Sequence, residues 1–318
     1  MGERLFHLAS DHRLGRTILV QNRSPEMPRY TPRKNDWADV ELVEALCRQT
    51  LNKQPKDVRY LEGGFNNANY ALDDELVLRL YAQGHEAALR ESKVLEIATW
   101  HGVPAPRILQ AGSFEERGFL LSELVPGRLM DDKADFADVG AHLARIHSLS
   151  FKGYGLFEAD GELRDVPSSL GEEIVADALN GRAGSRLGPE RILALLALEQ
   201  AQPHPQAPSL VHCDFNPKNI LVDDDGKVAA ILDWEFAMAG DPLIDLGNFF
   251  RFSEDYDPRQ MAQFEDGYRK AGGILPQDWK RQAQLHDLVS LVSFLDKPEH
   301  HPETFATALE RIDVLLAV

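Results

Sequence analysis

One segment of this chain, residues 211–235, constrains its fold and chemistry more than any other. It reads VHCDFNPKNILVDDDGKVAAILDWE and places Asp214, Asn219 and Asp233 in a fixed order. Between Asn219 and Asp233 lie two short runs of β-forming residues around the turn sequence Asp-Asp-Asp-Gly, which predicts a β-hairpin. A hairpin returns Asp233 to the neighbourhood of Asn219, which neither an extended chain nor a single helix would do so readily.

These three side chains are groups that phosphoryl transfer requires. Its transition state is loose, so the protein mainly positions the partners and neutralises phosphate charge. Asp214 is suited to orient and deprotonate an attacking hydroxyl. The amide oxygen of Asn219 and the carboxylate of Asp233 are hard ligands of the kind that Mg2+ prefers. We therefore expect Asp214 to be the catalytic base, and Asn219 and Asp233 to be the metal ligands.

The order HxDxxxxN, then a hairpin, then Asp resembles the catalytic and metal-binding loops of kinases. The form found here resembles the aminoglycoside phosphotransferase and choline kinase-like family of small-molecule kinases. Asp-Trp-Glu stands at 233–235, where protein kinases have Asp-Phe-Gly, and GDPLIDLG follows at 240–247. The gap between these motifs is too short for a protein-kinase activation segment, and no Ala-Pro-Glu follows.

The resemblance implies an α+β, protein-kinase-like bilobal fold. We expect residues 36–125 to form the N-terminal nucleotide-binding lobe, a five-stranded antiparallel sheet with one helix packed against it. Residues 126–318 then form the mainly helical catalytic and substrate-binding lobe. Residues 1–35 carry seven Arg or Lys against three Asp or Glu. We interpret them as a flexible extension or partner-docking arm, with a transit peptide as the alternative.

Hydrophobic periodicity and turn residues predict the elements of both lobes. A first helix is expected from Asn35 or Asp36, with Trp37 and Val43 on its apolar face. The expected strands are 58–61, 69–72, 76–81, 108–113 and 118–123. The expected later helices are 87–100, 136–150, 171–180, 189–201, 242–251, 258–271, 278–295 and 303–316.

A glycine pair lies between the first two expected strands. Gly63 and Gly64 allow a backbone turn to approach phosphate without an intervening side chain, although such a pair is also an ordinary hairpin connection. With Asn66 and Asn67 they resemble the glycine-rich loop of the family, which is followed by Asn. At the end of the fifth strand, the resemblance places the adenine-binding hinge, where we expect the Glu123 carbonyl and the Val125 amide to face the base.

Arg79 lies on the third expected strand, where a lysine that binds the α and β phosphates is usual in kinases. Guanidinium stays charged and binds phosphate or carboxylate in a bidentate manner, but its reach differs from that of an ammonium. We expect Glu91 on the following helix to pair with Arg79, with Glu86 as the alternative. The alternative without a function is that Arg79 is an outward-facing strand residue and Glu91 a solvated helix residue.

Several residues are expected to support the catalytic segment. His212 is expected to brace the metal-binding segment rather than to react. Lys218 either neutralises the transferred phosphate or faces solvent. Cys213 is interpreted as a packing residue rather than a nucleophile. Asp241 fits a helix N-cap, and Asp245 is expected to orient the catalytic backbone.

Composition excludes some classes of function. The net charge is -17, which disfavours general nucleic-acid binding and favours cationic substrates. No apolar run approaches the roughly 18 residues that span a bilayer, and no secretory signal is visible, so we expect a cytoplasmic protein that does not bind membranes. Two cysteines in unlike contexts suit a reducing compartment.

The sequence thus predicts a phosphotransferase that uses ATP, or alternatively GTP, with Mg2+ to modify a hydroxyl of a small polar molecule. Aminoglycosides, amino alcohols and sugar derivatives all fit this class of acceptor. The acids expected to face a cationic acceptor, or else merely solvent, are Glu172, Glu173, Asp177 and Glu235. The main alternative is a catalytically weak, nucleotide-binding regulatory pseudokinase, which the departure at Arg79 favours. A protein kinase is disfavoured because the activation segment is missing.

Overall fold

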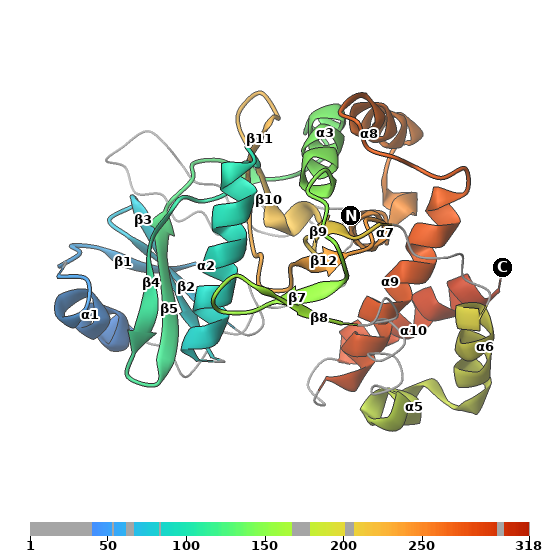
Figure 1. The fold of residues 1–318 in the computed structure, drawn as a ribbon, viewed down its shortest axis with the longest axis horizontal. Coiled ribbons are helices and arrows are strands. Elements are labelled where there is room, and N and C mark those ends of the chain that lie inside the picture. Colours follow the sequence, from blue (N-terminus) through green and yellow to red (C-terminus); the bar gives the residue numbers. More distant parts are fainter. Residues whose placement is uncertain are drawn as a thin grey trace, which may run out of the picture.

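We describe the protein from a computed structural model (Figure 1). The described residues are 40–52, 54–61, 67–82, 84–166, 179–200, 207–297 and 302–317. The expected extension 1–35 lies outside them, as does most of the helix expected at 171–180. Within the described part of the chain, no helix combines the length and apolar character needed to cross a membrane.

The N-terminal lobe is built on one five-stranded sheet with the order β1-β2-β3-β5-β4. Every neighbouring pair in it is antiparallel. Its elements are α1 (Val40–Gln49), β1 (Val58–Leu61), β2 (Ala68–Leu72), β3 (Leu76–Tyr81), α2 (His85–Trp100), β4 (Ile108–Phe114) and β5 (Arg117–Glu123). The predicted five-stranded antiparallel sheet is confirmed.

Both faces of this sheet are covered, whereas the sequence had suggested one packed helix. Side chains alternate along a strand, so Leu78 and Leu80 of β3 point to the face that α1 covers, where they join Val43 in one buried cluster. Tyr81 points to the other face and packs in a second cluster with Ala88 of α2. Figure 1 shows the two helices on different sides of the strands. Because α2 packs on the face that also meets the C-terminal lobe, side chains of β3 on that face lie near the site described below.

The C-terminal lobe is mainly helical, as predicted. Its helices are α3 (Phe136–His147), α5 (Arg182–Leu187), α6 (Pro189–Gln200), α7 (Leu243–Phe249), α8 (Pro258–Lys270), α9 (Trp279–Asp296) and α10 (Pro302–Leu316), with short 3-10 turns at Pro217–Asn219 and Ser253–Asp255. Gly140 and Gly267 let α3 and α8 pack closely, since a Cβ at either would collide with a backbone carbonyl of the other helix. Aromatic rings fill the space beneath, including the stacked pair Phe249 and Phe264.

Two small sheets hold the catalytic segment between the helices. The first has the order β11-β10-β6, from β6 (Arg128–Leu129), β10 (Ile220–Val222) and β11 (Val228–Ile231). The second has the order β8-β7-β12-β9, from β7 (Gly155–Phe157), β8 (Leu163–Asp165), β9 (Ser209–Val211) and β12 (Met238–Gly240). Met238 pairs with Val211, so the segment between them starts and ends at one sheet. This second sheet was not predicted from the sequence.

Candidate active site

The β10–β11 hairpin brings Asn219 and Asp233 together. Ile220 pairs with Ile231, and the Leu232 amide donates to the Asn219 carbonyl oxygen at 2.8 Å. Asp233 is therefore the first residue beyond the paired positions, beside Asn219. Its φ of 65° lies in the left-handed region and turns the chain out of the sheet. The hairpin predicted from the sequence is confirmed.

The carboxylate of Asp214 is held by two amides from its own loop. Asn216 Nδ2 donates to Oδ1 at 2.7 Å, and Asn219 Nδ2 donates to Oδ2 at 2.8 Å. Both amides also donate to the Asp214 carbonyl oxygen at 2.9 Å. Lys218 Nζ lies 3.7 Å from Oδ2. These donors fix the rotamer of Asp214 while leaving its side chain 20% exposed, so a small molecule can reach the carboxylate.

Asp245 organises the backbone that leads into this loop. It is fully buried, and its two oxygens accept hydrogen bonds from the amides of His212 at 2.8 Å and Cys213 at 2.7 Å. His147 Nε2 lies 3.1 Å from the same carboxylate, and His212 Nε2 donates to the Leu232 carbonyl at 2.8 Å. Cys213 has a φ of 64°, a strained conformation for a residue with a side chain, which these bonds hold in place.

Cys213 fits the packing role expected of it, and Asp241 has a structural role but lies one residue before the N-cap of α7, which is Pro242. Burial raises the pKa of the Cys213 thiol, and Asp245 and Asp214 raise it further, which disfavours a reactive thiolate. Asp241 Oδ1 accepts from the Leu243 amide at 2.9 Å, at the start of α7. Neither residue supplies a reacting group.

Arg79 connects the two lobes at the centre of the site. Its Nη2 donates to Asp233 Oδ1 at 2.6 Å and lies 3.5 Å from Glu235 Oε1. Its Nε lies 3.5 Å from Glu91 Oε2, the partner expected on α2. Glu91 also accepts from the Tyr81 hydroxyl at 2.5 Å and from the backbone amide at position 234 at 3.2 Å. One buried cation therefore lies between three carboxylates, one from α2 and two from the segment after β11.

This excess of acids perturbs the ionisation of the group. Burial raises the pKa of Glu91, against the opposing effect of Arg79. Burial would likewise raise the pKa of Asp233, but the charge and hydrogen bond of Arg79 keep it below its ordinary value. Burial and the charge of Asp233 raise the pKa of Glu235 to about 7. Asp233 is thus the carboxylate of the three that stays most firmly ionised.

Glu235 faces the N-terminal lobe. Asn67 Nδ2 donates to Glu235 Oε2 at 2.7 Å. Asn67 is the first described residue after the expected glycine-rich loop. Gly63, Gly64 and Asn66 lie outside the described residues. The structure therefore places Glu235 beside Arg79 and Asn67, whereas the sequence analysis had considered it for the acceptor.

The expected hinge lies at the end of β5. Glu123 donates through its amide to the Arg107 carbonyl at 3.0 Å, and its side chain forms an ion pair with Arg107 at the surface. The hinge role of the Glu123 carbonyl and the Val125 amide stays a prediction. Glu172, Glu173 and Asp177 lie outside the described residues.

The donor set fits a hard divalent cation. Among the described residues no group of three or more His, Cys, Asp and Glu side chains could hold a metal ion. Asn219 uses its amide nitrogen for Asp214, which leaves its side-chain oxygen for a cation, and Asp233 is ionised and 22% exposed. One amide oxygen and one carboxylate suit Mg2+, which keeps several waters and usually takes few protein ligands.

The family of the chain follows from comparison with known proteins. A family model described as the phosphotransferase enzyme family, APH, matches residues 57–285. The chain belongs to this family. The match covers the sheet of the N-terminal lobe, the hairpin and α7, and it confirms the resemblance inferred from the HxDxxxxN segment.

Several known proteins resemble this member of the APH family. Acyl-CoA dehydrogenase family member 10 of Mus musculus is 26% identical over 220 residues, which cover 62% of this chain and 20% of that protein. A solved aminoglycoside phosphotransferase in complex with AMP-PNP and hygromycin B has a TM-score of 0.65 at 21% identity, covering 86% of this chain and 97% of that one. A macrolide 2'-phosphotransferase from Brachybacterium faecium has a TM-score of 0.62 at 19% identity, covering 86% and 98%. This chain spans about a fifth of the length of the first curated relatives it matches.

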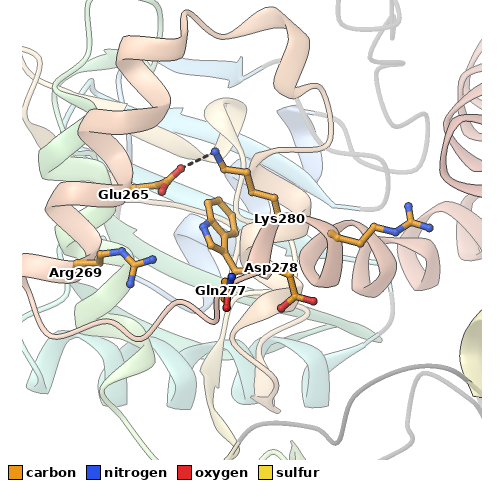
Figure 2. Close-up of a pocket in the computed structure, with 7 residues that line it drawn as sticks. Glu265, Arg269, Gln277, Asp278 and Lys280 are labelled. Carbon is orange, nitrogen blue, oxygen red and sulfur yellow. Dashed lines mark ion pairs between the residues drawn. The ribbon is translucent and has the colours of Figure 1, made fainter. Parts of the chain in front are cut away.

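A surface pocket lies away from the candidate active site. It is formed between α8 and the start of α9, and Figure 2 shows Lys280 in it reaching Glu265, with 2.7 Å between Nζ and Oε1. The other lining residues are Arg269, Gln277, Asp278, Trp279 and Arg281. These residues come from α8, the segment before α9 and the first turn of α9, and none of them belongs to the candidate site. The pocket is therefore separate from the site.

Two residues that organise the site, Tyr81 and His147, were not predicted from the sequence. Tyr81 lies two positions after Arg79, and the alternation of a strand places both on one face, so that pattern could have revealed it. Asn67 was expected only as part of the glycine-rich loop, and its bond to Glu235 was not foreseen. His147 is contributed by α3, far away in sequence, and nothing local marked its approach to the catalytic segment.

Proposed function

We propose that the protein transfers the γ-phosphoryl group of ATP, with GTP as the alternative donor, to a hydroxyl of a small polar molecule. The observation that carries this proposal is the arrangement around one hairpin. It places the oriented carboxylate of Asp214 next to Asn219, and Asn219 next to the ionised Asp233. The solved family relative that carries AMP-PNP supports a nucleotide as the donor.

The chain supplies a base and an anchor for the reaction. Asp214 accepts the proton of the acceptor hydroxyl as that oxygen forms a bond to the γ-phosphorus. The bond between the γ-phosphorus and the β–γ bridging oxygen breaks, and the nucleoside diphosphate leaves with that electron pair. Asn219 and Asp233 would hold Mg2+, which supplies neutralisation of phosphate charge when bound.

Arg79 is proposed to bind the phosphates of the nucleotide. In the structure its guanidinium bonds to Asp233 and lies near Glu91. Glu91 fixes the position of Arg79 from α2, while phosphate oxygens compete for the same donors that Asp233 now accepts. We propose the lobe limits 36–125 and 126–318, with the nucleotide held between them by residues on both sides.

Turnover with and without an acceptor tests this function. The purified chain would be incubated with Mg2+ and ATP, with GTP in parallel, and with a small-molecule extract, and mass spectrometry would follow any compound that gains one phosphate. Asp214→Ala should reduce transfer by at least a hundredfold, because the positioned base is lost. Asp278→Ala, in the separate pocket just before the start of α9, should transfer at the wild-type rate. Equal activity of the Asp214→Ala and unmodified chains would contradict the proposal.

One observation favours the pseudokinase alternative. The 2.6 Å bond from Arg79 occupies an oxygen of the expected metal ligand Asp233. A module that binds a nucleotide without transferring phosphate could keep this ion pair closed. Calorimetric titration with Mg2+-ATP distinguishes the two functions. A regulatory module binds the nucleotide but transfers phosphate to no compound in the extract, whereas a phosphotransferase does both.

A further inference from the structure

A tyrosine of α8 is connected by hydrogen bonds to the backbone that carries the proposed base. The Tyr268 hydroxyl lies 2.7 Å from His147 Nδ1, and His147 Nε2 lies 3.1 Å from Asp245 Oδ2. Asp245 in turn accepts hydrogen bonds from the two backbone amides that precede Asp214, at 2.8 and 2.7 Å. One chain of hydrogen bonds therefore joins α8, α3 and α7 to the catalytic segment.

The packing of α3 and α8 determines where this tyrosine lies. Figure 1 shows the two helices side by side, and a Cβ at Gly140 of α3 would lie only 3.0 Å from the backbone nitrogen of Tyr268. On the other side, a Cβ at Gly273 would lie 2.2 Å from the tyrosine ring. The ring also stacks on Phe264, with 6.3 Å between centroids and 12° between planes. Tyr268 is 1% exposed, so the direction of its hydroxyl is fixed by its surroundings.

The acceptors in this chain assign the direction of each hydrogen bond. The carboxylate oxygens of Asp245 already accept from two backbone amides, so the hydrogen between Asp245 and His147 belongs to Nε2 of the ring. In a neutral imidazole the other nitrogen, Nδ1, then carries a lone pair. The Tyr268 hydroxyl donates to that lone pair. Both bonds thus point from α8 toward Asp245.

Packing alone does not explain a hydroxyl at this position. A phenylalanine would fill the same space and stack on the same ring without burying a polar group. The side chain of His147 is only 3% exposed, so without the hydroxyl its Nδ1 would be a buried acceptor that lacks a donor. A ring that shifts to recover a donor no longer holds Asp245 in the same place. The hydroxyl therefore serves the position of His147.

We propose that Tyr268 is a positioning residue for the base Asp214, and that it acts through His147 and Asp245. This inference rests on the proposed phosphotransferase function, in which Asp214 accepts the proton of the acceptor hydroxyl. The chain of hydrogen bonds ends at the backbone before Asp214 and includes none of the side chains proposed to bind the nucleotide. Loss of the Tyr268 hydroxyl should therefore slow transfer and leave nucleotide affinity nearly unchanged.

Tyr268→Phe tests the effect on turnover. The full chain is incubated with Mg2+, ATP and the small-molecule extract, and the rate of phosphate gain is measured by mass spectrometry. At saturating ATP this rate should fall about fivefold or more, with less than about a twofold change in the KM for ATP. The matched control is Tyr256→Phe, which removes a hydroxyl that donates to the Phe249 carbonyl at 3.1 Å. It should transfer at the wild-type rate.

A double variant tests the route of the effect. In a chain that already carries Asp245→Asn, the change Tyr268→Phe should slow transfer by less than about twofold, because two residues of one network are not additive. A tyrosine that only stabilises the fold would lower the midpoint of thermal unfolding and leave transfer unchanged well below that midpoint. Equal fold-losses with and without Asp245→Asn would overturn the route through Asp245.

Hydrogen exchange of backbone amides tests the same route without any turnover. In Tyr268→Phe, the amides of His212 and Cys213 should exchange at least about fivefold faster by NMR, because their bonds to Asp245 are weakened. The amide of Leu210 is the internal reference, since it donates to the Leu149 carbonyl at 2.7 Å and has no bond to Asp245. Its exchange should stay the same.

The outcomes separate the two proposals. Faster exchange at His212 and Cys213 together with slower transfer supports the positioning role of Tyr268. Faster exchange in a chain that transfers phosphate to no compound supports the route and counts against the phosphotransferase function. Unchanged exchange at both amides, or unchanged transfer in an active chain, overturns the role of Tyr268.

Discussion

Asn67 donates a hydrogen bond to Glu235 at 2.7 Å, although 168 positions separate them in the chain. The bond joins the start of β2 in the N-terminal lobe to the segment that follows β11 in the C-terminal lobe. Glu235 lies only two residues after Asp233, so the bond fixes the expected metal ligand relative to the end of the expected glycine-rich loop. Together with the contacts of Arg79 and Glu91 to the segment after β11, this bond sets the distance between the lobes at the candidate site.

Removing either end of this bond should weaken nucleotide binding. Asn67→Ala and Glu235→Ala are each expected to raise the KM for ATP about five- to tenfold, since one hydrogen bond between the lobes contributes about 1 kcal/mol. The double variant should be little worse than either single one, with a coupling of about 1 kcal/mol. Steady-state kinetics of all three measure this cycle, and strictly additive effects would show that the two residues act independently.

Arg79 should matter for folding as well as for catalysis. Arg79→Ala leaves Glu91 buried without its cation, which is expected to lower the free energy of unfolding by about 3–5 kcal/mol. Arg79→Lys should cost less, because it keeps the charge and loses the fork geometry. The comparison is Arg59→Ala, which breaks an exposed 2.6 Å pair with Asp74 and should cost about 1 kcal/mol or less. Urea unfolding compares them, and equal losses would contradict the buried role.

How much of this molecule was predictable depended on the sequence distance of each contact. The hairpin that joins Asn219 to Asp233 was predictable because its strands and turn are adjacent and rich in β-formers. The sheet that pairs Met238 with Val211 was not, since its strands are three residues long and their partners lie far away in sequence. The approach of His147 to Asp245 at 3.1 Å escaped prediction for the same reason, because only tertiary packing brings α3 to the catalytic segment.

The same limit applies to the direction of side chains. The sequence indicated that Glu235 is an acid close to the site. It did not indicate whether its side chain faces an acceptor or the N-terminal lobe. Its contacts with Asn67, just before β2, and with Arg79 of β3 show that it faces the N-terminal lobe. A pattern along one segment does not contain that information.

Asp245 is expected to affect turnover more than nucleotide affinity. Asp245→Asn turns an amide donor toward the backbone amides of His212 and Cys213, which both donate to the carboxylate now. The left-handed conformation of Cys213 loses its support, and Asp214 is displaced with it. We expect kcat to fall at least tenfold with a smaller change in the KM for ATP. Asp257→Asn, a helix cap on α8, should leave kcat unchanged, and an equal loss in both variants would exclude a specific role for Asp245.

Asp135 should give the protein a pH-dependent contribution to stability. The hydrogen bond from Lys227, 2.6 Å from Asp135 Oδ2, lowers the pKa of this carboxyl below its ordinary value of 3.8, and the N-cap bond from the Asp138 amide adds to the effect. A lowered folded-state pKa means that the contribution is complete above the unfolded value and is lost as the pH falls through the folded value.

Asp135→Asn keeps a side-chain oxygen for the N-cap but removes the charge. We expect it to be less stable than the unmodified chain by about 0.5–1 kcal/mol at pH 7, the range for a partly exposed pair. The difference should persist down to about pH 5 and vanish at a pH below the folded-state pKa, where both chains carry a neutral group. Urea unfolding at pH 7, 5 and 2.5 measures it, and Lys227→Met should reproduce the same profile because it removes the other partner. A difference that stays constant down to pH 2.5 would show that the charge of Asp135 is not its source.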